Sequence, residues 1–100
     1  MYDMQNMNKL NRFADLAPEV WKAFVAFDQL ACKDGAIPAK YKELIAIAVA
    51  LTTQCPYCIE IHSRRAKQAG ATESELAETT LVAAALRAGA AVTHGTHALE

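Results

Sequence analysis

Glycine and proline are scarce in this chain, with 4 and 3 residues among 100. So few chain-breaking residues argue against a loop-rich or low-complexity protein, and they stand where helices are expected to begin or end. β-Branched residues do not alternate with polar residues over any useful length, so strand signals are nearly absent. The length suits one domain, over residues 1–100, and not two. We therefore expect a single, all-α domain.

Charge of one sign is also missing, because the net charge is -1 and the charged residues are scattered. Nucleic-acid binding needs a basic stripe, so no nucleic-acid partner is expected. No run reaches the roughly 18 uninterrupted apolar residues of a membrane span, and residues 1–5 lack the pattern of a signal peptide. The chain has 3 cysteines, an odd number, and two of them are only three positions apart. This pattern indicates redox or metal chemistry and no disulfide framework, so we expect the protein in the reducing cytoplasm.

Helical periodicity and end signals divide the chain into five or six helices, which predicts a compact helical bundle. Pro18 and Pro38 suit the start of a helix, and Gly35 suits a left-handed residue that closes one. Thr72 and Glu75 form a capping-box pattern before the last helix. The expected helices cover residues 4–14, 18–32, 39–54, 55–70, and 73 into the nineties.

Apolar residues make up 53% of the sequence, slightly above the average for soluble domains. A monomer of this size buries only part of its surface, so this much apolar material is hard to hide. The helix expected over 39–54 is apolar almost all round from Leu44 onward, which suits the centre of a bundle or a subunit interface. We therefore expect a homo-oligomer.

The residue types that carry chemistry cluster in one segment. Cys55, Cys58 and His62 lie one turn apart along a helix, so their side chains form a single stripe. Pro56 fits the first turn, which places Cys55 near the helix N-terminus, where free N–H groups and the helix dipole favour a thiolate. His62 can accept a proton from a neighbouring thiol. Glu43, on the preceding helix, could orient His62 or receive a relayed proton.

The joint spacing of these residues resembles a known signature. Glu43, eleven further residues, Cys55-Pro56-Tyr57-Cys58, three more residues and His62 resemble the alkylhydroperoxidase D branch of the carboxymuconolactone decarboxylase superfamily. The resemblance extends over about 37–89. Where some peroxidase members carry a histidine before the second cysteine, this chain has Tyr57.

The resemblance implies an all-α trimer or hexamer that reduces hydroperoxides or disulfides, with an external dithiol as reductant and no organic cofactor or metal. It assigns Cys58 as the attacking thiol, Cys55 as its proton donor and resolving partner, and Glu43 with His62 as the proton relay. The helix dipole alone favours Cys55 as the nucleophile. On this point we follow the resemblance.

Two other functions use the same residues. The cysteine pair with His62 and Glu43 could supply four zinc ligands, giving a zinc-binding or redox-sensing helical assembly without turnover. Alternatively, His62 and Glu43 alone could support a decarboxylase-like activity on a cyclic acid. Cys32 has no partner at motif spacing and is expected to pack in the core or an interface.

Overall fold

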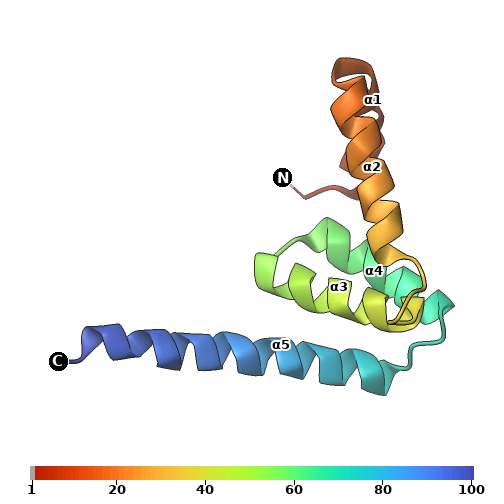
Figure 1. Cartoon of the computed structure of the whole chain (residues 1–100). Helices are drawn as coiled ribbons and strands as arrows, with labels where there is room; N and C mark the ends of the chain where they lie inside the picture. The colour runs from red at the N-terminus through yellow and green to blue at the C-terminus, as the bar shows by residue number, and fades with distance from the viewer. Residues whose placement is uncertain (1) are drawn as a thin grey trace.

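A computed structural model describes residues 2–100, which contain helices and no strand (Figure 1). The predicted all-α class with five to six helices is confirmed. In chain order the elements are a 3₁₀ helix η1 (Met4–Leu10), α1 (Asn11–Leu16), α2 (Pro18–Cys32), α3 (Ala39–Thr53), α4 (Pro56–Gln68), α5 (Glu73–His94) and a final 3₁₀ turn η2 (Gly95–Ala98).

The N-terminal half differs from the sequence expectation in two details. The helix expected over 4–14 is divided into η1 and α1; its first turns are rich in asparagine, a weak helix former, and the Asp3 carboxylate accepts from the Gln5 N–H at 2.9 Å. The expectation that Gly35 closes α2 in the left-handed conformation is wrong. Lys33 leaves α2 in extended backbone, and the positive φ angles among residues 2–100 occur at Gln54 and Gly70.

The turn between α3 and α4 determines where the first cysteine lies. Gln54 adopts the left-handed conformation with φ 58°, and the Cys55 N–H donates to the Ala50 carbonyl at 3.0 Å. This is a Schellman closure, which satisfies a carbonyl of the last turn of α3. Cys55 follows at once as the N-cap of α4. The two helices therefore run back along one another, with the cysteine segment at the turn.

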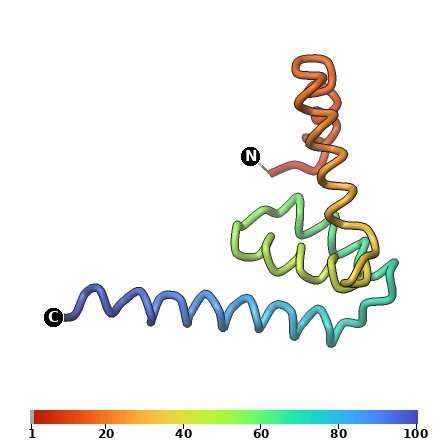
Figure 2. Tube along the Cα trace, viewed as in Figure 1, coloured from red at the N-terminus to blue at the C-terminus, as the bar shows by residue number. Residues whose placement is uncertain are grey.

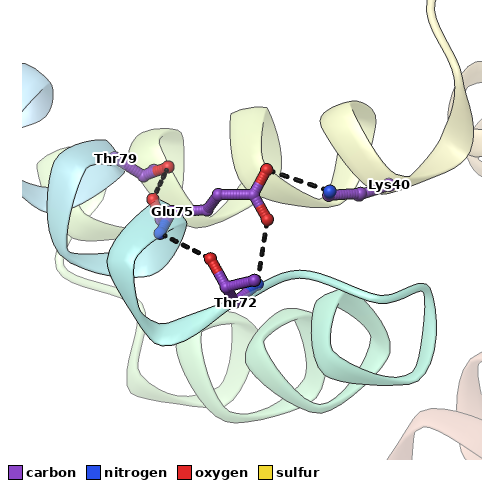
Figure 3. Close-up of polar contacts among 4 residues, drawn as sticks. All are labelled: Lys40, Thr72, Glu75 and Thr79. Carbon is purple, nitrogen blue, oxygen red and sulfur yellow. Dashed lines mark hydrogen bonds and ion pairs between the residues drawn. The ribbon is translucent and has the colours of Figure 1, made fainter.

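Helix α5 is fixed onto α3 at two places along its length. At its start, the Thr72 hydroxyl accepts from the Glu75 N–H at 3.1 Å, and Glu75 accepts from the Thr72 N–H at 2.9 Å, which is the predicted capping box. The other Glu75 carboxylate oxygen pairs with Lys40 of α3 at 2.9 Å (Figure 3). Further along, the Arg87 guanidinium donates to the Thr52 carbonyl at the end of α3.

The packed part of the chain is small. The buried apolar residues among those described are Ile47, Ala50, Ala66 and Ala83, on α3, α4 and α5. The C-terminal part of α5 continues past the end of α3, and α1 and α2 project from the other side (Figure 1). The radius of gyration is 16.6 Å, against about 13 Å for a compact domain of this length. Much apolar surface therefore faces outward.

The last helix is long and largely exposed. Residues Glu73–Ala98 contain an 18-residue stretch with a mean hydropathy of 1.2, so by length and composition the segment could cross a membrane. Subunit-interface and core helices of soluble proteins meet the same criterion, and this one is interrupted by Arg87, which is bound to α3. The feature alone is weak support for a membrane span.

Candidate active site

The first part of the site is a carboxylate–imidazole pair between α3 and α4. Glu43, Ile47 and Ala50 lie on one stripe of α3 and are its buried residues. Glu43 is only 8% exposed, and its Oε2 lies 2.5 Å from Nδ1 of His62. A buried carboxylate requires such a partner. The structure thus brings together the two residues that the sequence proposed as a relay, and the pair fixes the orientation of the His62 ring.

The second part is the cysteine pair at the start of α4. The sulfurs of Cys55 and Cys58 lie 2.6 Å apart, and both thiols are free. The Cys58 N–H donates to the Cys55 sulfur at 3.3 Å, so Cys55 caps the helix with its side chain. An S–S bond needs about 2.05 Å, so little movement separates the dithiol from a disulfide.

The surroundings of the two thiols shift their pKa values in opposite directions. The pKa of Cys55 lies below the usual range of a thiol, because the Cys58 side chain and then the Cys58 backbone N–H donate to its sulfur. The pKa of Cys58 is raised to about 11 by its burial and by the adjacent Cys55. Sulfur positions alone also permit the reverse arrangement, in which Cys55 donates to Cys58. The Cys58 backbone N–H points at the Cys55 sulfur, which favours the arrangement in which Cys58 donates and the resting thiolate is on Cys55.

Both cysteines open onto a cavity of about 570 Å³ between α2, α4 and η1. Its walls are mostly apolar, and His62 lies in its lining beside Asp28 and Arg65. The size suits a small organic molecule. A separate groove between α3 and α5, lined by Ile45 and Val82 among others, has no cysteine or histidine in its lining, so the chemistry belongs to the first cavity.

Cys32 lines the same cavity, although the sequence assigned it only to packing. Its pKa is raised, first by burial and then by the charge of Asp28. No spacing rule could have placed it there, because it belongs to α2 and only the tertiary fold carries α2 to the cysteine pair. The remaining histidines, His94 and His97, lie in edge contact with each other at 5.0 Å at the far end of α5.

The zinc alternative requires the ligands to converge on one point. Between residues 2 and 100, no group of three or more histidine, cysteine or acidic side chains is arranged to hold a metal ion. Instead the four residues form two pairs, Glu43 with His62 and Cys55 with Cys58. This arrangement places a proton-accepting pair between α3 and α4 and a pair of thiols at the start of α4.

The fold and site therefore define an all-α protein with a Cys-X-X-Cys centre and an adjoining carboxylate–histidine pair. The sequence profile of the carboxymuconolactone decarboxylase family matches residues 18–100, and the chain belongs to this family. The predicted resemblance to the superfamily is confirmed, and the site is consistent with its alkylhydroperoxidase D branch.

Similar proteins are found in several bacteria and an archaeon. "Uncharacterized protein 4 in cox locus" of Paracoccus denitrificans is 48% identical over 77 residues, which cover 77% of this chain and 69% of that protein. An uncharacterised Haemophilus influenzae protein is 45% identical over 83 residues, covering 83% and 74% of the two chains.

Two solved structures share the fold. A crystal structure of an apo carboxymuconolactone decarboxylase family protein from Legionella pneumophila has a TM-score of 0.76 at 39% identity, covering 93% of this chain and 83% of that one. A protein from Methanobacterium thermoautotrophicum gives 0.82 at 34% identity, covering 88% and 99%.

Proposed function

We propose that this protein is a cysteine-dependent oxidoreductase that reduces hydroperoxides or disulfides by cycling Cys55 and Cys58 between dithiol and disulfide. The observation that carries the proposal is the 2.6 Å separation of the two sulfurs at the N-terminus of α4. A pair so close can close into a disulfide without rearrangement of the helix. The lowered pKa of Cys55 raises its thiolate fraction above that of an ordinary cysteine.

The cycle begins when His62, held by Glu43, accepts one proton from the dithiol, directly or through water. The remaining proton passes between the two sulfurs, so a thiolate on Cys58 is reached by transfer of its proton to Cys55. Cys58 then attacks the peroxide oxygen and breaks the O–O bond, and the Cys55 thiol protonates the departing alkoxide. This assignment keeps Cys58 as the attacking thiol and Cys55 as its proton donor.

The second half of the cycle closes the disulfide. The Cys55 thiolate attacks the sulfur of the Cys58 sulfenic acid, and the hydroxide that leaves takes the proton from His62. One dithiol and one hydroperoxide thus give one disulfide, one alcohol and one water. An external dithiol restores the reduced pair by thiol–disulfide exchange. A pair that must be reduced in each turnover suits the cytoplasm.

The assay uses reduced protein, an organic hydroperoxide and a sulfenic-acid trap. We expect two thiols to be lost per peroxide consumed. In Cys55→Ser the trap should label Cys58, whereas Cys58→Ser should consume no peroxide; Cys32→Ser serves as the matched control and should behave as wild type. Label on Cys55 in Cys58→Ser would reverse the two roles. Peroxide consumption that is the same in all variants would refute the proposal.

A decarboxylase-like activity is a second candidate, supported by the family and by the Glu43–His62 pair. It would use an acid–base pair and no sulfur chemistry. Turnover of a cyclic acid that survives replacement of both Cys55 and Cys58 by serine would favour it over the oxidoreductase.

We also propose that the protein works as a homo-oligomer, either a trimer or a hexamer. Its support is the apolar surface that one chain leaves exposed, which includes Ile45 and Val49 of α3 and Val82 and Leu86 of α5.

A further inference from the structure

The N-terminal segment of residues 2–10 is attached through Asp3 and Asn6 to Tyr57, the residue just before Cys58. From there its trace rises in the view together with α1 and α2 (Figure 2). The Tyr57 hydroxyl accepts from the Asp3 N–H at 3.3 Å and from the Asn6 side-chain amide at 3.0 Å. The rings of Tyr2 and Tyr57 are in edge contact, with centroids 5.0 Å apart. Burial and the nearby Glu60 carboxylate raise the pKa of Tyr2. Three residues of one segment thus converge on one tyrosine.

The same segment forms one wall of the cavity onto which the cysteines open. Met7 and Leu10 lie in its lining, together with Cys55 and Cys58 of α4. Removing this wall would open the cavity on the side of η1. Access to the two sulfurs from this side of the cavity therefore depends on the position of residues 2–10.

The segment is held without deeply buried side chains. None of the residues of η1 is buried. Elements with few buried apolar contacts open locally at a low free-energy cost. The segment also lies outside residues 18–100, the part matched by the family profile. The two hydrogen bonds to Tyr57 join this segment to α4 directly beside the cysteine pair.

We propose that residues 2–10 are a strap that selects by size what reaches Cys55 and Cys58, and that Tyr57 is the latch that holds the strap closed. Small molecules enter the cavity with the strap in place, and bulky thiols and disulfides reach the sulfurs only when it opens. The purpose of this selection rests on the proposed function: the strap would admit a small hydroperoxide substrate and hold back the larger dithiol reductant until it opens. The strap itself is a physical barrier whether or not the site turns over.

The test compares thiol alkylation by a small and a bulky reagent. Cys32 is replaced by serine in every sample, so that the reagents report on the Cys55–Cys58 pair alone. Tyr57→Phe keeps the ring and removes the acceptor of both hydrogen bonds; Asn6→Ala removes one of them from the strap side. Tyr41→Phe is the matched control, because Tyr41 is an exposed tyrosine outside the cavity lining. The reagents are iodoacetamide and a maleimide attached to a long polyethylene glycol chain.

We expect Tyr57→Phe to raise the rate with the bulky maleimide about tenfold, the effect of losing two modest hydrogen bonds, and Asn6→Ala to raise it by a smaller factor. The iodoacetamide rate should change less than about twofold, because a small reagent does not need the strap to open. Equal acceleration with both reagents, or no acceleration in either variant, would overturn the proposal. Failure of the oxidoreductase proposal is a separate result: alkylation would follow this pattern while no peroxide is consumed.

Discussion

The exposed surface of a single chain leads to a prediction about assembly. The chain has a solvent-accessible area of 7719 Å² for a mass of 10.8 kDa. Folded monomers of this mass expose about 5,500 Å², so roughly 2,200 Å² is in excess. A standard interface buries about 800 Å² per partner. The excess corresponds to between two and three such patches per chain, which is what a closed ring such as a trimer needs, since each chain in it touches two others.

The perturbation is Leu86→Glu. Leu86 of α5 is 66% exposed, and Val82 lies one turn before it at 58% exposed. If this face packs against another copy, the substitution loses about 2 kcal/mol of leucine burial per chain. Desolvation of the new carboxylate costs several kcal/mol more. We therefore expect Leu86→Glu to dissociate the oligomer and, because one chain has few buried residues, to lower its helix content.

The assay is size-exclusion chromatography with light scattering, together with circular dichroism, at fixed protein concentration and without detergent. Wild type should show a mass that is a multiple of 10.8 kDa. Gln68→Glu adds the same charge at an exposed position of α4 and should leave the mass unchanged. A wild-type protein that is fully helical as a monomer would refute the reasoning. Wild type that stays in solution only with detergent or lipid would also refute it, and would assign the surface of α5 to a membrane.

Three further predictions concern the site and the turn beside it. Replacing Gln54 by glycine should stabilise the fold by about 1 kcal/mol, because the left-handed conformation costs a residue with a Cβ about that much; chemical denaturation measures it, and Gln54→Ala should give no such gain. In Cys58→Ala the thiolate of Cys55 loses the side-chain hydrogen bond that contributes most to its lowered pKa. The alkylation rate of the Cys55 peptide, followed by mass spectrometry, should therefore fall at neutral pH, and its pH profile should move to higher pH. A profile that does not move would contradict the assignment of the resting thiolate to Cys55. Glu43→Gln removes the carboxylate that holds His62 and should slow peroxide consumption by about 100-fold, if the relay acts in proton transfer; the thermal midpoint is the control, and a variant that folds normally and reacts at the wild-type rate would exclude Glu43 from the relay.

Local signals account for the parts of the fold that were predicted. Pro18 at the first position of α2 and the capping box of Thr72 and Glu75 act within one turn of the chain, so a sequence pattern is enough to read them. The residue that ends a helix in the left-handed conformation was harder to predict from the sequence. Gln54, and not Gly35, adopts the left-handed conformation, because the tight return of α4 along α3 demands it there whatever the residue's own preference.

The cysteine stripe was determined by the sequence alone, since residues three and four apart share a face of any helix. Pairing Glu43 with His62 was also foreseen, but only the packing of α3 on α4 brings their atoms to 2.5 Å. The lowered pKa of Cys55 agrees with its predicted place at the helix N-terminus, which is also a local feature. The tertiary structure alone placed Cys32 in the cavity and attached the N-terminal segment to Tyr57. These two features join residues that are distant in the chain, and spacing along a helix carries no information about such contacts.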